Sequence, residues 1–368
     1  MKIAINNLPL KSAHKTRGIG YYTKHLIEAL KQDTSCEVQE FTNISDVKGA
    51  DVVHYPWFDL FFHTLPLRKH FPTVVTIHDV MPLVFSAKYP AGLKGKINFI
   101  MQKTALRSCK YVITDSQASK TDIIKYLKIE GKKIAAIPLA IDPKFKIISN
   151  DTELLHIKRK YYLPDQFLLY VGDANWVKNL PFLIEGFQQL IKETDLGQVK
   201  LVLVGGVFLK DVENINHPEL ESLKLVNKLI KQYRLDTRII RPGQVSDEEL
   251  VAFYNLATIY VQPSLYEGFG LPVLQALACG VPVVSSNRGS LTEVGGDAVV
   301  YFDPTNLKQF IFTASDLLQD KSLRSKLSKL GLKQAAKFSW EKVAEETKSI
   351  YLRAIKNKTL DYFSLKNE

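Results

Sequence analysis

The segment "EGFGLPVLQALACG" carries residue types suited to holding a phosphorylated sugar. A glycine-rich turn at Gly268 and Gly270 leads into an apolar run that predicts a helix opening near Phe269 to Leu271. Free backbone N–H groups and the positive dipole end at a helix start favour a pyrophosphate. The two glycines let a ligand approach the backbone, and Glu267 beside them can accept hydrogen bonds from sugar hydroxyls. This turn is therefore a predicted binding site for a sugar linked to a pyrophosphate.

Gln275 lies two turns along the same expected helix, where a side chain can reach a ribose while Glu267 contacts the sugar. Such a turn needs a strand before it and a sheet to hold it. Short apolar runs do alternate with amphipathic stretches along the whole chain, which is typical of strand–helix–strand units that build parallel sheets.

Eleven apolar runs predict strands, and this number exceeds what one open twisted sheet usually holds. They lie near residues 2–6, 52–55, 74–78, 111–114, 134–138, 168–172, 201–205, 238–241, 259–262, 281–285 and 299–302. We predict an α/β chain with two Rossmann-like domains whose parallel sheets face an interdomain cleft, because ligand-binding loops gather at the carboxyl ends of such strands.

Proline, asparagine and clustered charges interrupt the alternation between Ile141 and Leu163. This break predicts domains at residues 1–155 and 156–340, with residues 341–368 as a C-terminal crossover helix and tail. Ser246 and Glu249 have capping-box spacing for a helix start. From Trp340 onward the sequence predicts a long amphipathic helix that packs back toward the N-terminal domain.

The net charge of +11 belongs entirely to the first half of the chain. Residues 1–163 hold 25 Lys and Arg against 14 Asp and Glu, whereas residues 164–368 hold 24 of each. A basic half indicates an anionic partner such as a lipid surface, a phosphorylated acceptor or nucleic acid, although a merely lysine-rich soluble surface explains it equally well. Between residues 88 and 133, lysines alternate with apolar residues at helical spacing, which suits either a helix on anionic lipid or an ordinary solvated face.

Other features exclude several classes of protein. No run approaches the length of a membrane-spanning helix, and the first residues enter an apolar strand without a secretory leader, so we expect a cytoplasmic protein. Cys36, Cys109 and Cys279 lie too far apart for a metal or redox motif and are expected to be buried thiols.

Several motifs together resemble glycosyltransferase family 4. They are "TRGIGYYTKHLIEAL", "TIHDVMPL", "YVGDANWVKNLPFLIEGF", "GQVSDEELVAFYNLA", the "EGFGLP" turn, "GSLTEVGGDAVVYFDP" and "FSWEKVAEET". The resemblance implies the GT-B fold and a retaining, metal-independent transfer of a hexose from GDP-mannose or a UDP-sugar. It implies a glycan or lipid-linked acceptor in surface polysaccharide assembly, no nucleic-acid partner, and a position in the cytoplasm or at the inner face of the membrane.

Carried over by motif, the resemblance assigns three catalytic residues. Lys178 neutralises the leaving diphosphate, Glu267 holds a sugar hydroxyl, and His78 meets the sugar from the opposite domain. The resemblance assigns donor-binding roles to three segments: the "TRGIG" loop, the "YVGD" loop and the turn after Glu267. These residues are Arg17, Gly18, Gly20, Gly172, Gly268, Phe269, Gly270, Leu271 and Gln275.

Three positions depart from the family pattern. Gln275 replaces a second glutamate, so it can bind ribose hydroxyls without charge assistance. Asp173 stands where an arginine usually lies beside the phosphates, and Val177 stands where a basic residue often precedes Lys178. Arg17 is our candidate for the missing charge.

Plainer explanations stay open for some of these residues. His78 could be a structural histidine, and Asp79 could orient it or cap the following turn. The aromatic run "HYPWFDLFF" could line an acceptor site through Trp57 and Phe58 or could be core. Alternative functions are a non-catalytic nucleotide-sugar-binding partner and a GT-B epimerase. An NAD-dependent oxidoreductase fits poorly, because Gly18-Ile19-Gly20 lacks a third glycine.

Overall fold

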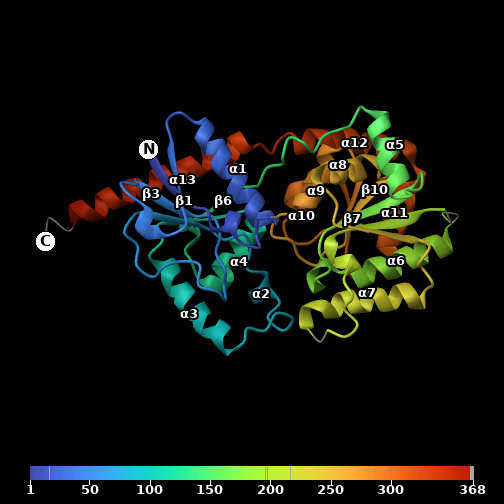
Figure 1. Cartoon of the computed structure of the whole chain (residues 1–368), viewed down its shortest axis with the longest axis horizontal. Helices are drawn as coiled ribbons and strands as arrows, with labels where there is room; N and C mark the ends of the chain where they lie inside the picture. Colours follow the sequence, from blue (N-terminus) through green and yellow to red (C-terminus); the bar gives the residue numbers. More distant parts are fainter. Residues whose placement is uncertain (16, 195, 197, 216, 365–368) are drawn as a thin grey trace. The chain divides into compact units, whose positions relative to one another are not determined.

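A computed structural model describes residues 1–15, 17–194, 196, 198–215 and 217–364, with side chains described up to residue 356. The chain forms two compact units. The first comprises Met1–Ala140 together with the chain from Phe338 onward, and the second comprises Ile141–Lys337. Each unit contains its own sheet and hydrophobic core (Figure 1).

The first unit is built on a six-stranded parallel sheet with the order β2-β1-β3-β4-β5-β6. Its strands are β1 (Lys2–Asn6), β2 (Glu37–Phe41), β3 (Val52–Tyr55), β4 (Thr73–Thr76), β5 (Tyr111–Thr114) and β6 (Ile134–Ala136). Its helices are α1 (Gly18–Gln32), α2 (Met81–Val84), α3 (Leu93–Arg107), α4 (Gln117–Leu127) and α13 (Trp340–Ser364). In Figure 1, α1 and α13 cover one face of the sheet and α3 lies on the opposite face.

The second unit has a six-stranded parallel sheet with the order β12-β11-β10-β7-β8-β9. The strands are β7 (Phe167–Val171), β8 (Lys200–Val204), β9 (Ile239–Gly243), β10 (Ile259–Gln262), β11 (Val283–Ser286) and β12 (Val299–Phe302). The helices are α5 (Asp151–Lys160), α6 (Leu180–Glu193), α7 (Glu221–Gln232), α8 (Asp247–Leu256), α9 (Leu271–Ala278), α10 (Leu291–Gly295), α11 (Leu307–Gln319) and α12 (Lys321–Ala335).

The predicted α/β class with two parallel sheets is confirmed, and all eleven expected strands are present within a few residues of their predicted bounds. The sequence missed β2 (Glu37–Phe41), whose residues "EVQEF" include only two apolar side chains among three polar ones. This strand lies at the edge of its sheet and is mostly exposed or half-buried, so it lacks the continuous apolar run of a central strand.

The boundary between the units falls at residue 140, earlier than the predicted residue 155. Residues 141–155 belong to the second unit because they are tied to α8. Asn255 accepts from the amide of Ile148 (2.8 Å) and donates to the carbonyl of Lys146 (3.0 Å). The return crossing begins at Phe338, slightly before the predicted residue 341.

Helix α13 packs on the first unit, as predicted, and contacts α1 and the central strands. Its Tyr351 is fully buried, and the hydroxyl lies 2.7 Å from Nδ1 of His54 on β3. Ser246 and Glu249 form the predicted capping box at the start of α8. Cys109 and Cys279 are buried, but Cys36 is half-buried because it lies in the surface turn before the edge strand β2.

Within the described residues, no helix combines the length and apolarity required to cross a bilayer. The two predicted aromatic candidates in the first unit behave differently. Phe58 is buried in the core, whereas Trp57 is half-buried and its ring lies 4.3 Å from that of His14.

Candidate functional site

Lys178 and Glu267 form an ion pair in the second unit, in which the ammonium group contacts both carboxylate oxygens. Lys178 Nζ lies 2.8 Å from Oε1 and 2.9 Å from Oε2 of Glu267. Gln262 Nε2 and Ser264 Oγ also donate to Oε1, at 2.9 and 2.7 Å. The side chains are 19% and 11% exposed, so the charges are largely shielded but can still be reached from solvent. The carboxylate is thus held in one orientation by four donated hydrogen bonds.

Strand order brings these two loops together. Lys178 follows β7, Glu267 follows β10, and β7 and β10 pair in parallel, so both loops leave the same edge of the sheet. The amide of Leu265 donates to the carbonyl of Val177 (2.7 Å), which joins the loops directly. Asn179, with φ of +56°, donates from its side chain to the carbonyls of Pro263 and Pro304.

The turn after Glu267 is supported from the loop that follows β11. Ser290 is fully buried, and its hydroxyl contacts the carbonyl oxygens of Glu267 (2.9 Å) and Phe269 (2.6 Å). Gly270 has φ of +106°, where a side chain would be strained, and it lies at the N-cap position of α9. Helix α9 starts at Leu271, so the predicted glycine-rich turn and helix start are present beside the ion pair.

The loop after β7 contains the predicted donor residue Gly172 and the acid Asp173, which departs from the family pattern. Gly172 has φ of +148°, and its neighbour Asp173 is exposed. Asp173 Oδ1 accepts from the amide of Ala174 (2.6 Å), and its carbonyl accepts from the hydroxyl of Tyr170 (2.7 Å). This acid therefore stabilises the turn, while Lys178 carries the positive charge of the loop.

Gln275 points its side-chain oxygen at a buried tyrosine. The hydroxyl of Tyr254 donates to Gln275 Oε1 across 3.0 Å. Because the amide oxygen is engaged, the NH₂ group is the part of Gln275 that can serve a ligand hydroxyl. The side chain is only half-buried, which is compatible with such a contact.

In the first unit, the ring of His78 is held through both nitrogens. Nδ1 lies 2.8 Å from Asp115 Oδ2, and Nε2 lies 3.1 Å from the carbonyl oxygen of Pro56. Burial lowers the pKa of His78, but the charge and hydrogen bond of Asp115, the charge of Asp79 and the Pro56 carbonyl outweigh it, so the pKa is raised overall. Burial raises the pKa of Asp115 against the opposing His78 charge. A sugar hydroxyl could use Nε2 only by sharing it with Pro56.

Asp79 caps the turn that follows His78. Its Oδ1 accepts from the amide of Met81 (2.9 Å), so of its two predicted roles the structure shows the cap of the turn. Asp115 takes the orienting role because it follows β5, which pairs with the strand that leads to His78.

A buried chain of hydrogen bonds runs behind His78. Tyr351 contacts His54, His54 Nε2 lies 2.8 Å from Thr76 Oγ1, and the Tyr22 hydroxyl lies 3.0 Å from the same oxygen. The ring edge of Tyr22 then meets His78, with centroids 5.0 Å apart. Burial lowers the pKa of His54 to about 3, so this histidine is neutral and structural.

Of the predicted donor residues at the start of α1, Arg17 and Gly18 are accessible to a ligand, whereas Gly20 is not. Arg17 and Gly18 are exposed at the start of α1, and Arg17 has no side-chain partner in the described part of the chain. Gly20 is buried, its amide donates to the carbonyl of His14 (3.2 Å), and a side chain there would collide with that carbonyl. Gly20 is therefore explained by packing within the loop. Thr16, inside the quoted motif, lies outside the described residues.

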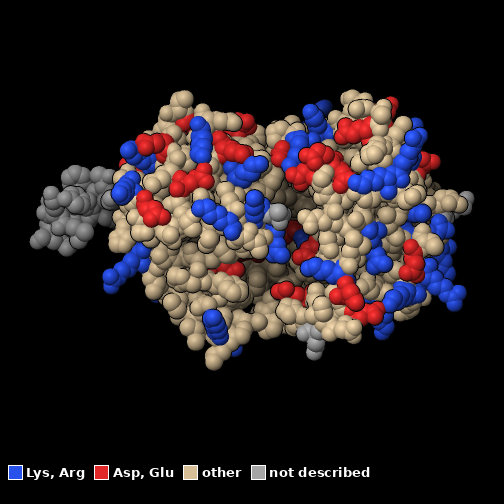
Figure 2. Space-filling model, in the orientation of Figure 1, with Lys and Arg blue, Asp and Glu red and all other residues tan. Residues whose placement is uncertain are grey.

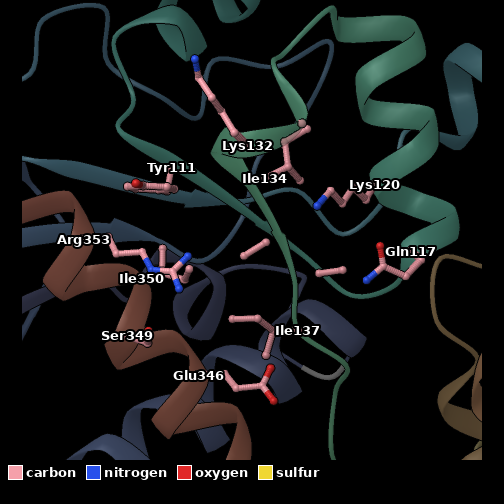
Figure 3. A pocket seen from close by; sticks show the side chains of 13 residues that line it. Tyr111, Gln117, Lys120, Lys132, Ile134, Ile137, Glu346, Ser349, Ile350 and Arg353 are labelled. Carbon is pink, nitrogen blue, oxygen red and sulfur yellow. The ribbon is translucent and has the colours of Figure 1, made fainter. Parts of the chain in front are cut away.

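Two cavities lie within single units, and neither is lined by the predicted donor residues. One of about 430 Å³ lies beside β6, between α13 and α4, where Arg353, Glu346 and Lys120 line it (Figure 3). The other, of about 470 Å³, lies in the second unit beside Asp211 and Arg241. The candidate residues lie instead in the joined loops after β7 and β10 of the second unit and, separately, in the loop after β4 of the first unit.

The sequence missed the residues that position the charged groups. Gln262 and Ser264 were adjacent to the predicted turn and could have been found from their polar side chains at a strand end. Asp115 follows the apolar run "YVIT", which is the same signal. Ser290 gave no signal, because its role depends on a carbonyl 23 residues away.

Known protein families match much of the chain. The family described as Glycosyl transferases group 1 matches residues 151–334, and the family described as Glycosyltransferase Family 4 matches residues 38–145. The chain is 33% identical to O-antigen chain mannosyltransferase B of Escherichia coli over 76% of this chain and 69% of that protein. It is 31% identical to the serotype-specific mannosyltransferase WbdA of Escherichia coli over 74% of this chain, but spans only 32% of WbdA.

Solved structures show the same fold at lower identity. Sucrose-phosphate synthase from Thermosynechococcus elongatus superposes with a TM-score of 0.74 at 20% identity, covering 96% of this chain and 98% of that one. The Anabaena protein HepE, in complex with UDP-glucose, gives a TM-score of 0.69 at 15% identity, covering 94% and 98%.

Proposed function

Because the chain belongs to the group 1 glycosyl transferases, we propose that it transfers a hexose from a nucleotide diphosphate sugar to a glycan or lipid-linked acceptor with retention of configuration. The observation that carries the proposal is the shielded Lys178–Glu267 pair beside the amide-lined start of α9. This arrangement offers a fixed cation, a sugar-binding carboxylate and backbone N–H groups within one loop cluster.

The departing diphosphate sets the requirement for the cation. As the bond between sugar C1 and the phosphate oxygen breaks, negative charge grows on the leaving group, and Lys178 stabilises it in a shielded site. Backbone N–H groups at Gly268 to Leu271 share that role. We propose that this charge stabilisation needs no metal ion.

Glu267 acts on the sugar itself. Its carboxylate accepts a hydrogen bond from a donor-sugar hydroxyl, and Gln262 and Ser264 keep the carboxylate in position. The acceptor oxygen attacks C1 on the face from which the diphosphate leaves, so configuration is retained. The acceptor proton passes to the leaving phosphate oxygen, which balances the reaction without a protein nucleophile.

The names of the relatives support a mannose donor, and those of the structural neighbours a uridine nucleotide. Two Escherichia coli relatives are mannosyltransferases, one of them for the O-antigen chain, while HepE was solved with UDP-glucose. We therefore propose GDP-mannose or a UDP-sugar as donor and surface polysaccharide assembly as the setting. His78, Arg17 and Gly18 of the first unit are proposed to contact the donor.

A thermal-shift screen with GDP-, UDP- and ADP-linked sugars tests the proposal, because a ligand that binds only the folded protein raises its Tm. At a ligand concentration about a hundredfold above Kd, the stabilisation is about 2.7 kcal/mol. One donor should raise Tm in the wild type and fail to do so in Glu267→Ala. Absence of a shift with every nucleotide sugar, combined with absence of donor hydrolysis, would overturn the proposed function.

A further inference from the structure

Helix α3 (Leu93–Arg107) is apolar on the side that faces solvent. Leu93, Ile97 and Ile100 are 79%, 53% and 65% exposed, and Met101 is 37% exposed. These residues are spaced by four, three and one positions, which places them on one face of the helix. The buried residues Gln102, Ala105 and Leu106 lie on the opposite face. The helix is thus apolar on its outer face as well as toward the core.

Positive charges flank this outer face without acidic partners. Lys96, Lys103 and Arg107 recur along one flank, and Lys94 lies on the other. None of the four forms an ion pair in the part of the chain that the structure describes. The sequence contains no Asp or Glu from residue 80 to residue 114. In Figure 2 the surface over α3, at the lower left, is mostly uncharged and is interrupted by basic residues.

The loop before β4 extends the apolar surface. Phe62 is 68% exposed, and its neighbour Phe61 is tied to α3: Asn98 Nδ2 donates to the Phe61 carbonyl (2.9 Å), and the Phe61 and Phe99 rings lie 6.4 Å apart. Leu67 in the same loop is also exposed. We name the set Phe62, Leu93, Ile97, Ile100 and Met101 the α3 face.

A solvated helix face does not explain this pattern. Exposed apolar residues scattered singly are ordinary, but a contiguous apolar stripe marks a binding surface. An apolar stripe between rows of lysine is the arrangement of a helix that lies in the headgroup region, with apolar side chains inserted and lysines extended sideways to lipid phosphates. The surplus of cations favours an anionic bilayer over a neutral protein surface.

We propose that the α3 face docks the protein on an anionic lipid bilayer. The purpose of docking rests on the proposed function, since it would bring the enzyme to a lipid-linked acceptor, but lipid binding itself requires no transfer reaction. Much of the basic excess also lies in this unit. Met1–Ala140 with residues 338–368 carries 26 Lys and Arg against 16 Asp and Glu, whereas Ile141–Lys337 carries 23 against 22.

Vesicle flotation of the full-length chain tests the proposal, with phosphatidylglycerol-rich and pure phosphatidylcholine vesicles at low and high salt. The wild type should float with the anionic vesicles at low salt and lose binding as salt screens the lysines. A cation near such a surface contributes about 1 kcal/mol, or about fivefold in partitioning, so Lys94→Gln/Lys96→Gln should weaken binding by about 25-fold. Ile97→Gln/Ile100→Gln should weaken it at least about tenfold.

Matched variants in the second unit serve as controls. Lys321→Gln/Lys326→Gln makes the same change in net charge on α12, and Leu155→Gln/Phe312→Gln removes two residues of comparable exposure, 49% and 72%. Both should change partitioning less than about twofold, given that neither lies on the proposed surface.

Several results would overturn the docking proposal. These are absence of wild-type flotation at low salt, equal binding to neutral vesicles, or equal loss in the control variants. A wild-type oligomer that Ile97→Gln/Ile100→Gln converts to a monomer, without a change in flotation, would assign the α3 face to self-association. Donor hydrolysis separates the two proposals: α3 variants should keep wild-type hydrolysis, and Lys178→Met should lose hydrolysis while still floating.

Discussion

Replacing Lys178 by methionine removes the side-chain cation that contacts both carboxylate oxygens of Glu267, while keeping a side chain of similar length. We expect the variant to bind the donor with a modest change in KM and to lose most of its kcat. The reason is that charge on the leaving diphosphate develops in the transition state, so the lost interaction belongs mainly to that state.

The magnitude follows from the geometry. Lys178 Nζ sits 2.8 Å from a carboxylate oxygen, so a phosphate oxygen that displaces or shares this contact can approach to about 4 Å or less. At about 4 Å and an effective dielectric constant of about 20, two unit charges interact by about 4 kcal/mol. Because about 1.4 kcal/mol corresponds to one decade in rate, kcat should fall by about three decades.

The same change also removes the counter-charge of Glu267, so stability must be measured beside activity. Breaking a buried pair costs about 3–5 kcal/mol, and residual solvent contact at both side chains reduces this to about 2–4 kcal/mol. Lys178→Met should therefore lower Tm by several degrees. Lys178→Met/Glu267→Gln should recover most of that loss, because the neutral amide can still accept from Gln262 and Ser264.

The assay is steady-state hydrolysis or transfer with the donor identified by thermal shift, in parallel with thermal unfolding of both variants. The reasoning is refuted if Lys178→Met retains more than about a tenth of wild-type kcat. It is equally refuted if the double variant regains activity together with its Tm, since the role of Lys178 would then be structural.

Three further predictions concern neighbouring contacts. Between about pH 5.5 and 9, Asp115→Asn should lower Tm most at the acid end, where His78 is protonated and Asp115 is charged. The loss of Tm should shrink as pH rises through the raised pKa of His78. A loss of Tm independent of pH over this range would contradict the ion pair. Gln275→Glu should lower donor KM by about three- to tenfold through charge-assisted bonds to ribose, while leaving the KM for a donor lacking both ribose hydroxyls unchanged. Equal effects on both donors would exclude the ribose contact. Ser290→Ala should destabilise the protein by about 1–3 kcal/mol and reduce kcat, because it removes the buried hydroxyl that contacts the carbonyls of Glu267 and Phe269. Full stability in thermal unfolding would contradict the support assigned to Ser290.

The sequence predicted the fold through local signals. Apolar runs marked the buried central strands, Ser246 and Glu249 marked a helix start, and Gly268 to Gly270 marked the turn. Each of these signals depends on residues only a few positions apart, so the amino-acid sequence alone is sufficient to predict these elements. The edge strand β2 was not predicted because most of its residues are exposed or half-buried and do not form an apolar run.

The positions of some candidate residues were also predictable, because polar side chains in the loops that follow apolar strands lie at the carboxyl edge of a parallel sheet. Lys178, Glu267 and His78 belong to this set, and motif resemblance assigned their roles. The outer face of α3 was visible as alternating lysine and apolar residues, but its direction was open. Burial of Leu106 and Ala105 on the other side decided that the apolar stripe faces solvent.

The partners of these residues depended on tertiary structure. Lys178 and Glu267 are 89 positions apart, and His78 and Asp115 are 37 apart. They meet because β7 lies beside β10 and β4 beside β5, an order that reflects how the helices pack on each sheet. Local residue patterns determine where a strand ends and which side chain follows it, but only the packing of whole elements selects which two strand ends become neighbours.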